Sequence, residues 1–267
     1  PNRDGRVVAI SKQVQITGSE GMLLGEEISA ALAAKGAPGV EFVVLNDTVA
    51  AVLGGVAGLE DEVFDGYAGL IYGTGVNTCY SERRENIAKL STPWPAASML
   101  INMESGGFCG VPQGTFDRRL DAGSMDAGKC LYEKMVSGRY QGEVIYHALR
   151  QGAEDGLFSS GLADTLRALD GLELVEADAF AARPYGGGLL SAACGSERDR
   201  ELVYTIIDRS VERAARLVCC NLAAVLEQAD LGRSIHRPAC VVAEGSTFYK
   251  GYLFRRKLER LCHTYIT

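Results

Sequence analysis

The sequence predicts an α/β fold in which helices flank a central sheet. Short apolar runs of strand length alternate along the chain with longer segments whose apolar residues recur at helical spacing. The longest helical pattern, residues 199–228, places its apolar side chains on one wide face, as expected for a helix packed on a core. Alternation of this kind is typical of a mostly parallel sheet.

The individual elements follow from local patterns. The predicted strands are apolar runs bounded by turn residues, at 5–10, 40–45, 67–72, 77–81, 98–103 and 238–243. The predicted helices carry apolar residues three or four positions apart, at 24–34, 48–56, 126–135, 142–151, 162–169, 199–228 and 248–265. A Gly-Thr-Gly turn joins the strands 67–72 and 77–81 and predicts a hairpin there.

The charge, the apolar stretches and the cysteines of the chain exclude some classes of binding partner. The chain has 267 residues, enough for a buried core, and a net charge of -7 without a basic run, so nucleic-acid partners are not expected. The apolar stretches fall short of the roughly 20 residues that span a bilayer, so no membrane partner is expected. The eight cysteines lack CxxC spacing and form no ligand cluster with the three histidines, which predicts reduced structural thiols, no metal site and a cytoplasmic location.

Polar groups follow two of the predicted strands where each strand ends. The run 42–45 ends in Asn46 and Asp47, and the run 68–72 ends in the turn 73–75. Open α/β sheets bind ligands at the carboxyl ends of their strands. A carboxylate there can accept a proton from a hydroxyl, and glycines let backbone N–H groups approach a phosphate. The pattern favours phosphoryl transfer to an alcohol.

Each of these residues also has a purely structural interpretation. Asp47 could equally be the N-cap of a helix that starts at Thr48. The glycine turn could be an ordinary hairpin connection. Glu104 and Glu133, each taken alone, read as exposed surface charges.

Five short motifs resemble those of the hexokinase family and occur in the family's order over nearly the whole chain. They are Leu45-Asn46-Asp47-Thr48-Val49, Gly73-Thr74-Gly75-Val76-Asn77-Thr78-Cys79-Tyr80, Ile101-Asn102-Met103-Glu104, Glu133-Lys134-Met135-Val136-Ser137-Gly138 and Gly245-Ser246. The resemblance implies an actin-like ATPase-domain (ribonuclease H-like) fold with a mixed sheet flanked by helices. It also implies ATP-dependent phosphorylation of a hexose, glucose by default, at its 6-hydroxyl.

The resemblance assigns roles to particular residues. Asp47 would be the general base that takes the proton of the sugar hydroxyl. The residues that would hold the sugar, besides Asp47, are Ser11, Lys12, Asn46, Asn77, Glu104 and Glu133. Those that would contact ATP are Gly73, Thr74, Gly75, Gly245 and Ser246. Mg²⁺ would arrive with ATP, because magnesium binds mainly through substrate phosphates and water.

Two departures from the family pattern qualify this expectation. Ser105-Gly106 stands where the family has Trp-Gly, and nothing before Ser11 resembles the family's first phosphate loop. We therefore expect residues 1–12 to be the end of a small domain, 13–245 the large domain, and 246–267 a C-terminal helix that packs toward the small domain, whose core is missing here. Such a fragment would turn over poorly. The alternatives are a noncatalytic hexose-binding regulator and a kinase for another polyol or amino sugar.

Overall fold

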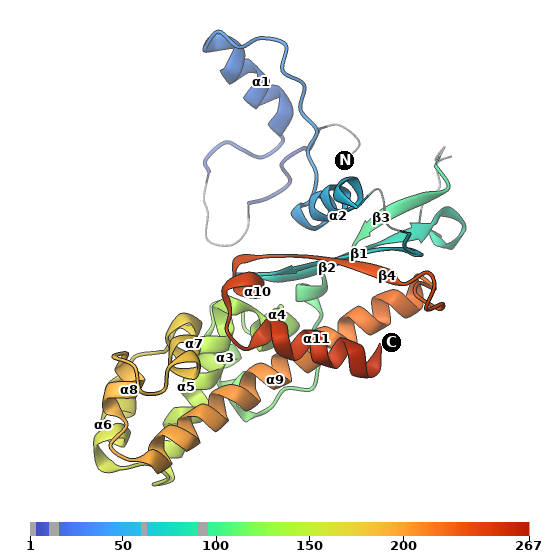
Figure 1. The fold of residues 1–267 in the computed structure, drawn as a ribbon. Coiled ribbons are helices and arrows are strands. Elements are labelled where there is room, and N and C mark those ends of the chain that lie inside the picture. The colour runs from blue at the N-terminus through green and yellow to red at the C-terminus, as the bar shows by residue number, and fades with distance from the viewer. Residues whose placement is uncertain (1–3, 11–15, 60–62, 90–95, 267) are drawn as a thin grey trace.

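The computed structural model describes residues 4–10, 16–59, 63–89 and 96–266 (Figure 1). Its sheet contains four strands in the order β3-β2-β1-β4. Their bounds are Gly66–Tyr72 for β1, Val76–Arg83 for β2, Ser98–Asn102 for β3 and Ala239–Glu244 for β4. The first three are joined antiparallel, and only β4 runs parallel to its neighbour β1. The expectation of a mostly parallel sheet is wrong, because the turn between β1 and β2 is too short for a parallel crossover. The mixed sheet is confirmed.

Side chains alternate between the two faces of this sheet. Helix α2 (Asp47–Gly58) covers one face, where the thiol of Cys79 donates to the carbonyl of Thr48 at 3.4 Å. Helices α9 (Glu197–Gln228) and α11 (Phe254–Tyr265) lie on the other face, as Figure 1 shows. There Leu70 and Tyr72 of β1 enter the main core together with buried residues of α9. The sheet is therefore a layer between helices.

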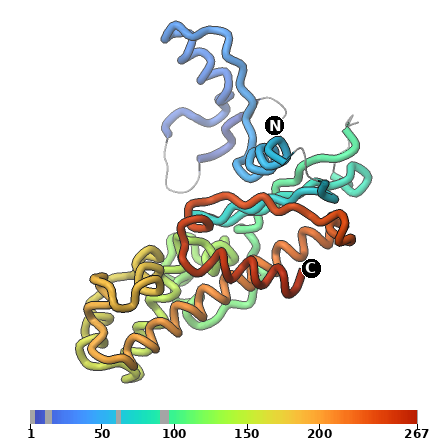
Figure 2. The backbone as a smooth tube through the Cα atoms, in the orientation of Figure 1, coloured from blue at the N-terminus to red at the C-terminus, as the bar shows by residue number. Residues whose placement is uncertain are grey.

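A group of helices packs along the half of α9 that extends beyond the sheet (Figure 2). Their bounds are Thr115–Gly123 for α3, Leu131–Val136 for α4, Gly138–Glu154 for α5, Ser160–Ala168 for α6, Leu174–Ala182 for α7 and Leu189–Ala193 for α8. The apolar stripe of α9 supplies their common core, as its spacing predicts. Helices α3, α7 and α8 were not predicted, since each is short and weakly patterned.

Two predicted strands are absent from the described residues. Segment 40–45 belongs to no strand, and the side chain of Val43 within it is 62% exposed. Segment 5–10 makes only an isolated bridge, between Arg6 and Leu23, beside helix α1 (Leu24–Ala34). Both predictions are wrong for the described chain, because backbone pairing of 5–10 is limited to residues 5–7 with 21–24, and 40–45 joins no sheet.

Two predicted helices differ most from the observed ones. The helix predicted at 126–135 begins only at Leu131, because Gly128 and Cys130 adopt positive φ angles of 81° and 50°. The helix predicted at 248–265 is two helices, α10 (Ser246–Lys250) and α11. The break at 251–253 is held by the Asp178 carboxylate, which accepts the amide hydrogen of Tyr252 at 2.6 Å.

No helix among the described residues is both long and apolar enough to cross a bilayer. The domain boundaries stay a prediction.

Candidate active site

A hydrogen-bonded polar cluster lies where β2 begins and β3 ends. The side-chain amide of Asn77 donates to Oδ1 of Asn102 at 2.7 Å, and the Asn102 amide donates in turn to Oε1 of Glu104 at 2.7 Å. Oδ1 of Asn77 accepts the amide hydrogens of Thr78 at 2.8 Å and Ser105 at 3.2 Å. The antiparallel pairing of β2 with β3 brings these residues together. Glu104 itself remains exposed.

Glu133 joins this cluster from helix α4. Its Oε2 accepts the amide hydrogen of Val76 at 3.2 Å. A Cβ at Gly106 would stand 3.1 Å from the same oxygen and 2.8 Å from the Val76 carbonyl, so the chain approaches Glu133 closely only because residue 106 is glycine. Among the predicted sugar-binding residues, Asn77 and Glu104 are therefore linked through Asn102, and Glu133 is bonded to the backbone of Val76, next to Asn77. Asn102 was not singled out, although it stands two positions before Glu104 in the same motif.

Asp47 is the first residue of α2, and Asn46 is its N-cap. Oδ1 of Asn46 and Oδ1 of Asp47 both accept the amide hydrogen of Thr48, at 2.9 and 2.8 Å. Within the described chain Oδ2 of Asp47 accepts no hydrogen bond, and the residue is exposed. The N-cap interpretation of Asp47 is thus wrong, since Asn46 fills that role.

The sheet places Asp47 near the polar cluster. The Cys79 thiol of β2 donates to the carbonyl of Thr48, the residue that follows Asp47, so Asp47 lies beside this strand. Burial raises the pKa of the Cys79 thiol to about 11, and the negative charge of Asp47 adds to the increase. Cys79 is two positions from Asn77 in β2, so their side chains share one face of the sheet. That face is the one covered by α2.

A second part of the candidate site lies at the carboxyl ends of the parallel strands β1 and β4. The turn 73–75 follows β1, and its Gly73 carbonyl accepts the amide hydrogen of Gly138 at 2.9 Å. Gly245 follows β4 with φ of 127°, and a Cβ there would collide with the carbonyl oxygen of Tyr72. Only glycine fits such a position. Both predicted glycine turns therefore meet at one edge of the sheet.

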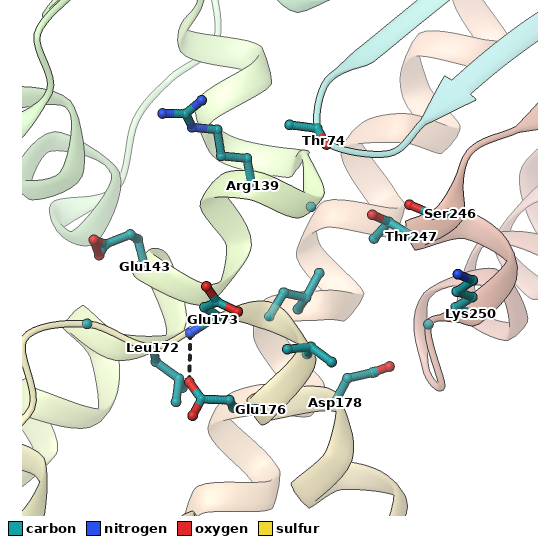
Figure 3. A pocket seen from close by; sticks show the side chains of 15 residues that line it. Thr74, Arg139, Glu143, Leu172, Glu173, Glu176, Asp178, Ser246, Thr247 and Lys250 are labelled. Atoms are coloured by element: carbon teal, nitrogen blue, oxygen red, sulfur yellow. Dashed lines mark hydrogen bonds between the residues drawn. The ribbon is translucent and has the colours of Figure 1, made fainter. Parts of the chain in front are cut away.

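A groove of about 840 Å³ opens beside these turns, between α5, α7 and α10 (Figure 3). Its wall on the sheet side carries the hydroxyls of Thr74, Ser246 and Thr247. Its other polar residues are two cations and four carboxylates, namely Arg139, Lys250, Glu143, Glu173, Glu176 and Asp178. Burial raises the pKa of the Asp178 carboxyl, against the effect of the backbone amides of Tyr252 and Leu253. Neither the cations nor the carboxylates were singled out from the sequence.

The remaining predicted site residues have other positions. Ser11 and Lys12 lie outside the described residues. Gly75 stays in the β1–β2 turn, where its carbonyl accepts the amide hydrogen of Gly73 at 3.0 Å, and it does not line the groove. Across residues 4–10, 16–59, 63–89 and 96–266, no group of three or more His, Cys, Asp or Glu could hold a metal ion.

Comparisons with known sequences point to one family. The sequence model described as Hexokinase matches residues 67–267. Hexokinase-3 of Mus musculus is 32% identical over 219 residues, which are 78% of this chain and 23% of that protein. The Hexokinase-like 1 protein of Arabidopsis thaliana is 31% identical over 254 residues, 91% of this chain and 51% of that protein. The chain thus spans at most about half of these relatives' lengths.

A comparison with solved structures identifies the fold. The solved structure of a hexokinase from Schistosoma mansoni, complexed with glucose, superposes with a TM-score of 0.76 at 22% identity over 98% of this chain and 60% of that one. This likeness shows that the protein has the actin-like ATPase fold, in agreement with its mixed sheet and flanking helices. Because the family match covers well over half of the sequence, the chain belongs to the hexokinase family.

Proposed function

We propose that this protein takes part in the ATP-dependent phosphorylation of a hexose, glucose by default, at the 6-hydroxyl. One observation carries the proposal. Thr74, which lies in the turn between β1 and β2 and lines the groove, stands three positions before Asn77, which is the second residue of β2 and lies in the polar cluster. A phosphoryl donor in the groove and a sugar at the cluster would therefore be neighbours, as direct transfer requires.

The polar cluster suits a hexose. Each sugar hydroxyl both donates and accepts a hydrogen bond, and the cluster offers both functions through the amides of Asn77 and Asn102 and the carboxylates of Glu104 and Glu133. A site lined in this way discriminates against analogues that lack a hydroxyl, because its own polar groups would be left unpaired. The glucose in the solved hexokinase of similar fold supports the choice of substrate.

Asp47 would act on the proton of the attacking hydroxyl. Its Oδ2 accepts no hydrogen bond within the described residues, so that oxygen is available to take the proton of the 6-hydroxyl. Phosphoryl transfer otherwise depends mainly on positioning and on neutralised charge.

The groove is the proposed place for ATP. Thr74 and Ser246 would hydrogen-bond its phosphates, while Gly73 and Gly245 keep the backbone free of side chains there. Mg²⁺, bound to the phosphates, would supply positive charge to the transferring group.

The test compares Asp47→Asn with the unmodified protein, both as the native full-length polypeptide. We expect hexose-dependent ADP release to fall by about 10²–10⁴-fold, with sugar binding retained. The matched control is Asp164→Asn, which makes the same chemical change at an exposed ion pair on α6. Equal turnover in Asp47→Asn and in the unmodified protein would refute the role of Asp47.

A noncatalytic hexose-binding regulator is the second candidate. It is favoured by Ser105, a small residue where the family has tryptophan, whose buried hydroxyl has no hydrogen-bond partner among the described residues. Measurable sugar binding without any turnover in the unmodified full-length protein would establish this candidate in place of the kinase.

A further inference from the structure

Two of the eight cysteines lie on segments that border the polar cluster. All eight thiols are free in the structure. Cys109 is exposed and follows the segment in which Ser105 bonds to Asn77. Cys130 is half-buried at the N-cap of α4, three positions before Glu133. Neither thiol has a role in the proposed phosphoryl transfer.

The contacts of the Cys109 segment lie on both sides of Cys130 along the chain. The Cys109 thiol donates to the carbonyl oxygen of Gly128 at 3.6 Å. The backbone carbonyl of its neighbour Phe108 accepts the amide hydrogen of Tyr132 at 3.0 Å. Positive φ angles of 81° at Gly128 and 50° at Cys130 bend the chain between these two contacts. Cys130 is therefore the middle residue of the short segment that packs against Cys109.

The two thiols differ in their readiness to react. The exposed Cys109 side chain is accessible to a small oxidant in the solvent. Burial raises the pKa of the Cys130 thiol, the charges of Glu133 and Asp126 add to the increase, and Lys134 opposes it. Because the thiolate is the form that attacks a peroxide, Cys130 is the less reactive of the two toward the oxidant itself.

We propose that Cys109 and Cys130 are a redox-active pair that a hydroperoxide converts to a disulfide. With hydrogen peroxide, the Cys109 thiolate attacks one peroxide oxygen, and the O–O bond breaks. A sulfenic acid and hydroxide form, and the hydroxide takes up the proton that the Cys109 thiol released. The Cys130 sulfur, losing its own proton, then attacks the Cys109 sulfur, the S–O bond breaks, and water leaves. The two thiols are oxidised and the peroxide is reduced.

This bond would join the segment that follows Glu104 covalently to the start of α4, which carries Glu133. The geometric requirement is modest, since the Cα atoms of a disulfide usually lie about 4.4–6.8 Å apart and only local side-chain rotation is needed within that range. The inference does not depend on the proposed function, because it concerns the two thiols and an oxidant alone.

Peptide mapping of the full-length protein, first reduced and then treated with dilute hydrogen peroxide, tests the proposal. Trypsin cleaves after lysine and arginine, so Cys109 lies in peptide 90–118 and Cys130 in peptide 130–134. We expect mass spectrometry to find these two peptides joined after oxidation, with the loss of two hydrogen atoms. Dithiothreitol should separate them.

Two variants resolve the steps of the reaction. Cys130→Ser removes only the second thiol, so the sulfenic acid at Cys109 should persist and be labelled by dimedone several-fold more than in the unmodified protein. Cys220→Ser is the control, because it removes an exposed thiol from α9. We expect it to form the joined peptides as the unmodified protein does.

Three results would overturn the pair. In the first, peptides 90–118 and 130–134 stay separate although Cys109 is oxidised. In the second, peptide 90–118 joins a peptide other than 130–134, which would make another thiol the partner. In the third, peroxide leaves Cys109 unmodified. None of these measurements uses hexose phosphorylation, so each result leaves the proposed function standing.

Discussion

The side-chain oxygen of Asn77 accepts the amide hydrogen of Ser105 at 3.2 Å, and this bond ties the start of β2 to the segment that follows Glu104. The amide nitrogen of Asn77 simultaneously donates to Asn102. One buried side chain thus orders both segments of the polar cluster.

Asn77→Ala is expected to abolish hexose binding and to lower the free energy of unfolding by about 1–3 kcal/mol. The reason is that the Ser105 amide hydrogen would be left buried without its partner. Calorimetry with glucose and urea denaturation measure the two effects. Asn86→Ala removes a hydrogen bond to Glu82 outside the cluster and is the control for binding. Glucose affinity equal to that of the control would contradict the proposed sugar site.

Gly245→Ala is expected to destabilise the protein by about 1–3 kcal/mol. The residue has a φ of 127°, and the added methyl group would meet the Tyr72 carbonyl, whose carbon would lie only 2.5 Å away. Thermal and urea unfolding provide the measurement. Gly187→Ala is the control, because no atom lies within 4 Å of the added methyl group there. The φ angle of Gly187 also lies outside the positive range that strains other residues. The prediction fails if the two variants unfold at the same urea concentration.

Lys134→Met is expected to cost roughly 3 kcal/mol of stability, because it leaves a largely buried carboxylate without its counter-ion. The Lys134 side chain is 1% exposed and its ammonium donates to Asp121 at 2.7 Å and to the Ser124 hydroxyl at 2.8 Å. Burial disfavours the charge of Lys134, but the carboxylates of Asp121 and Asp126 outweigh this effect and raise the pKa of Lys134. Arg233→Met breaks the exposed ion pair with Asp230 instead and should change stability by less than about 0.5 kcal/mol. A small effect of Lys134→Met would show that the buried pair contributes little.

His147 is expected to make the protein less stable as the pH falls below about 6.5. Burial lowers the pKa of this imidazole, reinforced by Arg119 and Arg150 and opposed by Glu143. The unfolded chain therefore takes up a proton near pH 6.5 before the folded protein does, and stability declines until the pH drops below the folded-state pKa.

His147→Gln should reduce that pH dependence, measured as the urea midpoint at about pH 7.5 and about pH 5.5. His236→Gln, at an exposed histidine, is the control and should retain it. An unchanged pH dependence in His147→Gln would rule out this residue as its source.

The sequence alone determined the local elements and their chemistry. The hairpin of β1 and β2, helix α9 and strand β4 were predicted to within a few residues, because their apolar spacing and their turns are local signals. The same motifs predicted that Asn77, Glu104 and Glu133 act together; in the structure Asn102 links Asn77 to Glu104, and Glu133 bonds to the backbone next to Asn77.

Only the tertiary structure decided which groups meet and which apolar runs are buried. Segment 40–45 has the pattern of a buried strand, yet it is exposed, because burial depends on a neighbouring strand that local pattern cannot specify. The groove joins residues 74, 139, 173 and 246 from four separate segments, and the position of Asn102 between Asn77 and Glu104 depends on strand register. Long-range pairing sets these contacts, and spacing along the chain does not encode it.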